Sequence, residues 1–543
     1  MRIGVDVGGT NTDAVLMDGT SPVASTKQPT SADVSSGVAA AIEAVLAGAG
    51  APREAITSMM IGTTHFTNAL VERSRLDEVG ILRLASPSGE ALPPLTGWPD
   101  DLVGQIGRNR FLLPGGYEFD GREIASFDEA KVRAAARELR ERGIRAVAIS
   151  CAFAPINPAM EVEAARIVQE EHPDAVVSQS HAIGRLGLVE RENGVILNAA
   201  LTTLAGKVMA SFEQALHAIG LHAPLYISQN DGTLISAGHA ARYPVLTIGS
   251  GPTNSMRGAA FLTGLRDAIV MDVGGTTCDI GALAGGFPRE SSVAVDIGGV
   301  RTNFRMPDVL AIGLGGGTRI HLAPERYGAE RLDKADFRVG PDSVGYRIAE
   351  DAFLFGGRTL TTSDIAVAAG HARFGDPAGL PGLSGPVIEA VWGRIQSLLE
   401  DGLDRMKTAR GDTPIIAVGG GHFLISDRLK GAAEVIRPAH AEVANAVGAA
   451  IAQIGAQIER IVDYEALPRE QTLERIRAEA AERVAAAGGV PASVEIVEID
   501  ETFLGYLPGR CAQLRVKAVG DLAESGVAPG SLAEEREPAR HAS

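Results

Sequence analysis

Two copies of one short motif carry the residues of this sequence that are best suited to chemistry. Asp-Val-Gly-Gly-Thr-Asn-Thr-Asp occupies residues 6–13, and Asp-Val-Gly-Gly-Thr-Thr-Cys-Asp recurs at residues 272–279. Each copy lies between two short apolar runs, a pattern typical of a β-hairpin with a glycine turn. Because a repeated motif itself indicates architecture, we expect one site built from two halves.

The composition of the repeat suits a bound metal nucleotide. Paired glycines can adopt positive φ and let backbone N–H groups approach a phosphate, and threonine hydroxyls supply further donors. The aspartate that ends each incoming strand, Asp6 or Asp272, can hold Mg²⁺ or its waters because that cation prefers hard oxygen ligands. A single copy would equally suit a plain tight hairpin in which Asp and Thr satisfy the turn backbone. The matching second copy favours the binding interpretation.

The bulk properties are those of a globular protein with more than one domain. A chain of 543 residues is too long for one compact core, so two or three domains are expected. The formal charge of −17 argues against nucleic acid or an anionic membrane as a partner, because neither is attracted to an acidic surface. A phosphate must therefore be bound by a small group of donors in one place and not by the overall charge of the surface.

Cysteine usage and the start of the chain favour the cytoplasm. The three cysteines, Cys151, Cys278 and Cys511, are odd in number and far apart, which argues against a disulfide framework or a paired-cysteine metal site. No signal peptide is expected, because Met1 leads directly into the first apolar run. No membrane span is expected either, because polar or charged residues interrupt the apolar stretches.

Helical and strand patterns alternate along the chain, which favours an α/β fold. The predicted helices include one that crosses between lobes, residues 190–219, and five others: 35–49, 128–142, 155–171, 386–410 and 442–462. After residue 466 a helical stretch and two alternating runs predict a small C-terminal α+β unit. The polar residues 531–543 are expected to be disordered.

Other segments offer weaker signals for ligand contact. Two later runs of three glycines follow predicted strands, and the second suits an adenosine because glycines let the backbone lie flat against a nucleotide. Residues 247–255 form a glycine-rich entry to a helix near Ser255, which fits an anion cradle or a simple capped turn equally well. His65 suits capping or packing better than metal or acid–base chemistry. The roles of Asp231 and His422 are also left open.

The two hairpins, the late glycine run and the helix between them resemble the actin, sugar-kinase and heat-shock-seventy ATPase fold. Within that fold, the sequence is similar to the hydantoinase A/5-oxoprolinase family over nearly all of residues 1–522. No single motif carries the resemblance. The matching segments are residues 6–13, 62–69, 197–200, 250–252, 271–279, 313–318, 362–364, 419–421, 444–450 and 515–521.

The resemblance implies a reaction and its participants. Such proteins use ATP to open a cyclic amide or imide, or to carboxylate a ketone in the related carboxylases. It implies that the substrate carbonyl oxygen attacks the γ-phosphate, with catalysis coming from positioning and charge neutralisation. ATP and Mg²⁺ are the implied cofactors, and a cyclic amide or ketone is the implied substrate. An oligomer is expected, with a second subunit, hydantoinase B-like or other, because the chain is shorter than the larger members.

Each predicted site residue has an expected role. Asp6 and Asp272 would organise Mg²⁺. Asp13 or Asp279 would orient the attacking oxygen or a water, although either also suits a turn cap. The predicted nucleotide-binding residues are Gly8, Gly9, Thr10, Asn11, Thr12, Gly274, Gly275, Thr276, Thr277, Gly315, Gly316, Gly317, Gly419, Gly420 and Gly421.

The expected fold is α/β, with duplicated ribonuclease-H-like (actin-like ATPase) lobes, an interlobe cleft and a small C-terminal α+β unit. The expected domains are an N-terminal lobe over residues 1–185 with an insertion near 84–127, a second ATPase lobe over 186–465, and a C-terminal unit over 466–543. The expected function is that of an ATP-dependent amidohydrolase subunit, hydantoinase- or oxoprolinase-like.

Several alternatives stay open at this point. They are an ATP-dependent ketone carboxylase subunit, an actin-like switch ATPase without small-molecule chemistry, and a small-molecule kinase. A reductive activator is disfavoured, because the scattered cysteines offer no set of ligands for an iron–sulfur cluster. Departures from the family pattern at residues 65–66, 191–194 and 229–232, where substrate would sit, leave the substrate open.

Overall fold

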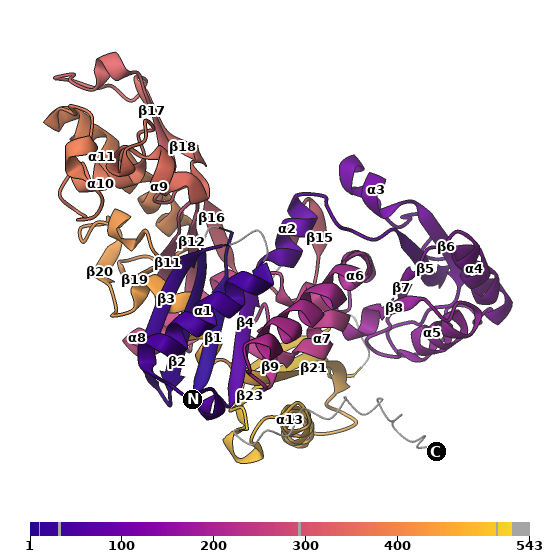
Figure 1. The fold of residues 1–543 in the computed structure, drawn as a ribbon. Helices are drawn as coiled ribbons and strands as arrows, with labels where there is room; N and C mark the ends of the chain where they lie inside the picture. Colours follow the sequence, from indigo (N-terminus) through magenta and orange to yellow (C-terminus); the bar gives the residue numbers. More distant parts are fainter. Residues whose placement is uncertain (10, 31–33, 292–294, 506–508, 524–543) are drawn as a thin grey trace.

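The computed structural model describes residues 1–9, 11–30, 34–291, 295–505 and 509–523 (Figure 1). Its largest sheet has nine strands, in the order β22-β23-β21-β10-β9-β4-β1-β2-β3. Strands from both ends of the described chain therefore share one sheet. Their bounds are β1 Arg2–Val7, β2 Asn11–Asp18, β3 Ser21–Pro29, β4 Ser58–Thr63, β9 Leu225–Ser228, β10 Thr233–Ser236, β21 Gln453–Asp463, β22 Glu495–Phe503 and β23 Cys511–Gly520.

A second sheet repeats the central arrangement of the first. In the nine-stranded sheet, β1 and β2 pair antiparallel and β4 runs parallel to β1. In the second sheet, β11 and β12 pair antiparallel and β19 runs parallel to β11. This duplication within a mixed α/β structure confirms the predicted fold class. The strands are β11 Ala268–Val273, β12 Cys278–Ala284, β13 Phe287–Pro288, β16 Val309–Ile312, β19 Thr413–Val418 and β20 Ala432–Ile436.

A third, smaller sheet is wholly parallel and has the order β6-β5-β7-β8. Buried polar contacts attach it to the long helix α6: Arg83 Nε donates to Glu192 Oε1 at 2.8 Å, and Ser150 Oγ donates to the same oxygen at 2.7 Å. Its elements are β5 Val79–Ser86, β6 Asn109–Pro114, β7 Ala146–Cys151, β8 Val176–Gln179, α3 Asp100–Ile106, α4 Glu129–Glu141 and α5 Ala159–Glu171.

The long helix predicted between lobes is α6, Leu188–Ala218, which packs on β7 and also on α1 and α7. Its apolar character follows from this position, since residues on all of its sides are buried in its first half. Within the described part of the chain, it is the one helix long and apolar enough to cross a membrane, and 61% of its most apolar window is buried in the protein.

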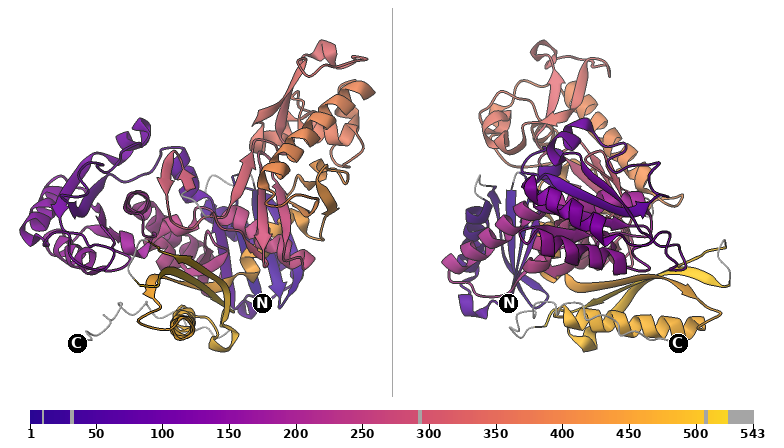
Figure 2. Two further views of the ribbon diagram at one scale, coloured as in Figure 1. Left: turned by 180° about the vertical axis from the view of Figure 1, so that it is seen from behind. Right: turned by 90° about the vertical axis from the view of Figure 1, so that its right-hand side faces the viewer.

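The remaining elements cover the sheets and form an arm. Figure 2 shows the parallel sheet and the arm that carries β17, β18 and α11 diverging from a base that contains α13. The bounds are α1 Val34–Ala49, α2 His65–Val71, α7 Ala237–Arg242, α8 Ser250–Thr263, α9 Ile348–Asp351, α10 Thr362–Ala368, α11 Gly385–Met406, α12 Ala444–Ile451, α13 Arg469–Ala486, β14 Val295–Ile297, β15 Val300–Thr302, β17 Thr318–Leu322 and β18 Phe337–Ser343.

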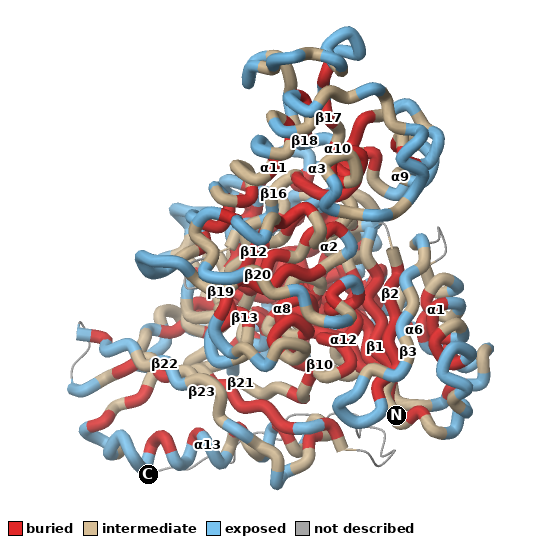
Figure 3. Tube along the Cα trace, turned by 90° about the vertical axis from the view of Figure 1, so that its left-hand side faces the viewer, coloured by how far each residue is buried: buried red, intermediate tan, exposed pale blue. Residues whose placement is uncertain are grey.

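Helices α8 and α12 pack together so closely that their backbones touch, and most of their residues are buried (Figure 3). Glycine makes this approach possible: a Cβ on Gly258 would lie 1.8 Å from the Ala444 carbonyl oxygen, and one on Gly448 would lie 1.8 Å from the Asn254 carbonyl oxygen. Because neither backbone can yield by that much, both positions require glycine. The pair fixes α8 against the strands that carry the first hairpin.

The prediction of one long helix over residues 442–462 is wrong. The chain forms α12 over Ala444–Ile451 and then enters strand β21. Ile454, Ile458 and Val462 are four residues apart, and side chains with this spacing share a face in a strand as well as in a helix. Pairing of β21 with β10 and β23 decides between the two, and these three side chains pack in the core beneath α13.

The C-terminal helix and two strands predicted after residue 466 are confirmed as α13, β22 and β23. Both strands belong to the nine-stranded sheet, since β22 pairs with β23 and β21 pairs with both β23 and β10. The nine-stranded sheet thus takes strands from all three expected domains, and the proposed boundaries stay a prediction. Residues 531–543, expected to be disordered, lie outside the described residues.

Candidate active site

The two hairpins meet across the interface between the two main sheets. Asp6 pairs in register with Asp13, and Asp272 pairs with Asp279. Burial and the charge of Asp13 raise the pKa of Asp6 to about 7, and the charge of Asp272 acts in the same direction. The charge of one hairpin thus acts on the other, so the two copies of the repeat lie near each other, and their forming one site stays a prediction.

The first hairpin is held by a lysine and an asparagine. Lys27 Nζ donates to both carboxylate oxygens of Asp13 at 2.5 Å. Asn445 Nδ2, on α12, donates to Asp6 and to Asp13 at 3.0 Å each. Burial raises the pKa of Asp13, while the ammonium of Lys27 opposes that rise. The two aspartates of this hairpin are therefore bridged and partly neutralised.

The second hairpin has fewer partners. Ser255 Oγ donates to Asp272 Oδ2, whereas the side chain of Asp279 makes no hydrogen bond to any described residue. Burial, followed by the charge of Asp272, raises the pKa of Asp279 to about 7. This carboxyl group can therefore exchange a proton near neutral pH.

One helix turn connects the two halves. The consecutive residues Asn254 and Ser255 of α8 hold different hairpins: Asn254 Nδ2 lies 3.4 Å from Asp6 Oδ1, while Ser255 binds Asp272. Helix α8 begins at Ser250, five residues earlier than the predicted start near Ser255. The contacts made by Asn254 and Ser255 therefore come from the second turn of the helix and not from a cap.

The two later glycine runs lie against the turn of the second hairpin. Gly316 N donates to Gly274 O at 2.9 Å and Gly317 N to Gly275 O at 2.7 Å. On the other side, Gly421 N donates to Val273 O at 2.7 Å, and a Cβ on Gly419 would lie 2.1 Å from Asp272 Oδ1. The sequence prediction that these runs belong to one nucleotide site is consistent with this packing and remains a proposal.

The turns retain donors that a phosphate can use. Both turns close with the same bond, Gly8 N to Asn11 O and Gly274 N to Thr277 O, each 2.9 Å. Among the described residues, no acceptor is found for the backbone N–H of Gly275, and Thr276 and Thr277 are exposed. In the first turn, Gly9 is exposed and the Thr12 hydroxyl lies 3.3 Å from that of Thr30. Thr10 lies outside the described residues.

The charges of the site suit a divalent cation. The four hairpin aspartates lie near the ammonium of Lys27, and burial raises the pKa of all four carboxyl groups. No group of three or more His, Cys, Asp or Glu side chains within the described ranges is arranged to hold a metal alone. Mg²⁺ commonly takes only one or two carboxylates and completes its shell with phosphates and water. Asp6 and Asp272 fit that pattern.

Family models match most of the chain. The model described as Hydantoinase/oxoprolinase N-terminal region matches residues 2–172, and the model described as Hydantoinase/oxoprolinase matches residues 191–375. The chain belongs to the hydantoinase/oxoprolinase family. Each family model contains one of the two hairpins, which confirms the resemblance drawn from the sequence.

Curated relatives of this family member include two enzyme subunits. The Caprolactamase subunit alpha of Pseudomonas jessenii is 27% identical over 400 residues, which are 69% of this chain and 55% of the relative. The Acetophenone carboxylase gamma subunit of Aromatoleum aromaticum is 28% identical over 403 residues, 68% of this chain and 53% of the relative. The chain spans about half the length of the curated relatives it matches.

Solved structures share the fold. The ATP-dependent caprolactamase from Pseudomonas jessenii aligns with a TM-score of 0.74 and 20% identity, over 96% of this chain and 88% of that chain. A nucleotide-free acetone carboxylase structure aligns with a TM-score of 0.68 and 19% identity over the same shares. Both alignments therefore extend over both lobes and beyond the family models.

The three residues whose roles the sequence left open lie in different surroundings. His65 Nδ1 lies 2.5 Å from the Thr63 hydroxyl, and its ring packs edge-on to Phe212. His422 Nδ1 lies 2.8 Å from the Gly419 carbonyl, inside the last glycine run. Asp231 belongs to a separate group of charges around Lys517.

The sequence analysis did not assign site roles to Lys27, Asn254, Ser255 or Asn445. Asn254 and Ser255 end the glycine-rich segment that was predicted to be a possible anion cradle, and Asn445 lies in a segment used for the family resemblance. Of these four residues, Lys27 is the one that no sequence motif indicates, because its contact with Asp13 depends on the register between β2 and β3.

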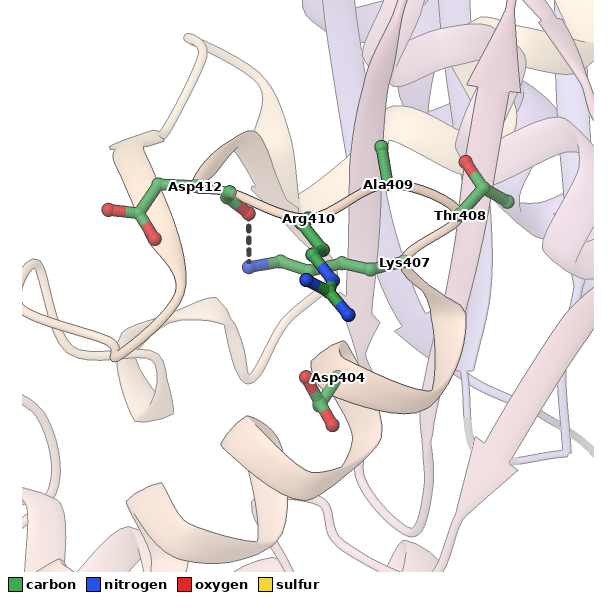
Figure 4. A pocket seen from close by; sticks show the side chains of 7 residues that line it. Asp404, Lys407, Thr408, Ala409, Arg410 and Asp412 are labelled. Atoms are coloured by element: carbon green, nitrogen blue, oxygen red, sulfur yellow. Dashed lines mark hydrogen bonds between the residues drawn. The ribbon is translucent and has the colours of Figure 1, made fainter.

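A hollow on the surface has no part in this site (Figure 4). It is lined by the loop from α11 to β19, and Lys407 Nζ donates within it to Gly411 O at 3.0 Å. The loop precedes β19, whereas the glycine run at residues 419–421 follows that strand. The hollow therefore lies at the opposite end of β19 from the hairpins.

Proposed function

We propose that this chain is the ATP-binding subunit of an ATP-dependent amidohydrolase that phosphorylates the carbonyl oxygen of a cyclic imide or lactam to promote ring opening. The observation that carries the proposal is the joining of the two Asp-Val-Gly-Gly-Thr hairpins through Asn254 and Ser255 in a member of this family. The similarity to a caprolactamase subunit supports a lactam as the substrate class.

Each part of the site has a proposed task. Asp6 and Asp272 would hold Mg²⁺, which when bound would neutralise phosphate charge. The backbone N–H groups and hydroxyls of the two turns would bind the phosphates. The glycine run at 315–317 braces the turn of the second hairpin, and the run at 419–421, on its other side, would contact the adenosine.

The two remaining aspartates differ in what they can do. A lactam resists hydrolysis because amide resonance makes its carbonyl carbon a poor electrophile, and ATP would supply the phosphoryl group that removes this protection. Burial raises the pKa of Asp279 to about 7, and its carboxyl group makes no hydrogen bond to a described residue, so it can orient and deprotonate a water or hold the substrate oxygen. Asp13 is paired with Lys27, so Asp279 is the stronger candidate for the catalytic carboxyl group.

A second subunit is part of the proposal. The relatives carry subunit names, and this chain spans about half of their length. We infer that a hydantoinase B-like or other partner completes the reaction. A ketone carboxylase subunit is the second candidate, because the identity to the acetophenone carboxylase subunit is as high as that to the caprolactamase subunit.

The deciding experiment measures phosphate release from Mg·ATP by the purified chain, alone and with its candidate partner. Hydantoins, lactams, and ketones with bicarbonate are supplied in turn, and ring opening or carboxylation is followed in parallel. Phosphate release coupled to ring opening supports the amidohydrolase. Release that requires a ketone and bicarbonate supports the carboxylase instead, and a stable phosphoester product contradicts both.

A further inference from the structure

Four cationic side chains from distant parts of the chain converge away from the hairpins, and we call them the four-cation cluster: Arg185, Arg305, Arg515 and Lys517. Lys517 is 4% exposed, Arg305 11%, Arg515 15% and Arg185 20%. Arg515 and Lys517 lie on β23, Arg185 precedes α6, and Arg305 follows β15. Burial lowers the pKa of Arg185, and the charges of Arg515 and Arg305 lower it further. The guanidinium groups are thus close enough to repel one another.

Three carboxylates lie among these cations. Glu290 accepts from Arg305 Nη1 at 2.9 Å and lies 3.5 Å from Lys517 Nζ, which also lies 3.1 Å from Asp231. Glu459 is more distant, 3.9 Å from Arg185 Nε. Two further carboxylates, Glu498 and Asp500, bind only Arg515 Nη2 and are 34% and 52% exposed. Five carboxylates therefore accompany the four cations, and three of them, Asp231, Glu290 and Glu459, are less than 20% exposed.

Several donors in this cluster are buried without an acceptor. Within the described residues, no hydrogen-bond partner is found for Nε and Nη2 of Arg305, Nε of Arg185, Nε of Arg515 or Nε2 of Gln457. Gln457 and Glu459 pair in register with Lys517 and Arg515 on β21 and β23, so the four side chains share one face of the sheet. Leaving a buried donor unpaired costs about 1–3 kcal/mol, and more when the group is charged.

We propose that the four-cation cluster is a binding site for a small oxyanion, a carboxylate or a phosphate. Guanidinium groups match the planar or tetrahedral oxygens of such anions in two-point contacts, and Arg305 offers two unpaired donors for that purpose. The side-chain amide of Gln457 supplies a neutral donor to the same anion. No residue of the cluster contacts the hairpin aspartates, so this is a second site.

Helix α8 gives the second site a structural connection to the hairpins. Arg257, two residues after Ser255, lies over the ring of Phe287 with its guanidinium carbon 3.8 Å from the centroid, and Lys517 Nζ lies 5.2 Å from the same ring. Arg257 Nη1 donates to Gly286 O at 2.8 Å. The Phe287 ring is thus a shared wall between the cluster and the helix that holds Asp6 and Asp272.

The test is calorimetric titration of the full chain, without ATP, with sodium phosphate and separately with sodium acetate, each against sodium chloride of equal ionic strength. The wild type is expected to bind at least one of the two anions. Arg305→Gln should weaken that binding on the order of tenfold. Arg305→Lys should weaken it by less, because lysine keeps the charge but lacks the paired N–H donors of the guanidinium group. Arg469→Gln, in the exposed pair with Glu501, should leave binding unchanged.

The choice between the anions identifies the source of the ligand, since preference for phosphate indicates a phosphorylated ligand and preference for acetate a carboxylic acid. Gln457→Met removes one unpaired donor without changing charge and provides a second test if Arg305→Gln does not fold. Absence of binding by either anion, or equal affinity of the wild type, Arg305→Gln and Gln457→Met, would overturn the proposal. Because ATP is omitted, the result is independent of the proposed amidohydrolase activity.

Discussion

The two hairpins have the same backbone register but different neighbours. Strand β3 lies beside β2 and places Lys27 opposite Asp13, whereas β16 lies beside β12 and places Ala311 opposite Asp279. At equivalent positions, one hairpin therefore has an ammonium and the other has a methyl group. The carboxyl group of Asp279 keeps a pKa raised to about 7, and no cation of the described residues forms an ion pair with it.

This difference shows how two copies of the same hairpin can have two different functions. The hairpin with Lys27 and Asn445 is rigidly bonded, as a structural support for bound phosphate requires. The other hairpin is flanked by two glycine runs and keeps one carboxyl group free of hydrogen bonds from the described residues. We infer that the first half positions the nucleotide and that the second half provides the group that acts on substrate or water.

The largest expected effect is that of Asp272→Asn. This substitution removes the charge proposed to hold Mg²⁺ but keeps a group that can bind Ser255. ATP turnover should fall about 100-fold or more, equivalent to roughly 2.7 kcal/mol of transition-state stabilisation. Steady-state phosphate release measures the change. Asp412→Asn, at the exposed loop before β19, is the control, and equal turnover in the two variants would disprove the metal assignment.

Removing the ammonium from the first hairpin should make it less stable. Lys27→Met leaves Asp13 buried without its cation, and unfolding by urea at pH 8 should show a loss of about 2 kcal/mol, less than for a fully buried pair because Lys27 is 31% exposed. The loss should shrink as the pH is lowered, because burial raises the pKa of Asp13 and protonation removes its unpaired charge. Lys131→Met, in an exposed pair with Asp128, should change stability little, and a pH-independent loss would contradict the explanation.

Adding an ammonium to the second hairpin tests whether the lack of one explains the raised pKa of Asp279. Ala311→Lys should place a cation opposite Asp279 and lower the pKa of that carboxyl group by about 1–3 units. Turnover should fall about tenfold, and its dependence on pH should move to lower pH. Ala284→Lys, at the end of the same strand β12, is the matched control. An unchanged pH profile in Ala311→Lys would show that Asp279 is not the titrating group.

A further expected effect is on the pH dependence of stability. A carboxyl group whose pKa is raised on folding binds its proton more tightly in the folded state. Stability should therefore fall as pH rises from the unfolded value near 4 to the folded value of about 7, and should then level off. Asp279→Asn should flatten this fall in the ligand-free protein, as urea unfolding between pH 4.5 and 8.5 would reveal. A curve that coincides with the wild type would refute the assignment.

What the sequence predicted well was what adjacent residues determine. The turn chemistry of the Asp-Val-Gly-Gly-Thr repeat and the glycine runs is local, so the hairpins and their pairing partners were found from composition and spacing. Lys27 reaches the site through the register between β2 and β3, which no local pattern reveals, whereas Asn445 lies in a segment that the family resemblance already used. The strand β21 was mistaken for a helix because its apolar side chains recur every fourth residue, a spacing that both structures share.

The position of β21 in the nine-stranded sheet has a consequence for synthesis on the ribosome. Strand β10 is complete when residue 236 has been made, but its parallel neighbour β21 begins only at Gln453. More than two hundred residues are therefore translated while one edge of β10 has no strand beside it. An open strand edge invites pairing with other chains. We therefore expect this interval of synthesis to be the one in which the nascent chain is most exposed to pairing with other chains.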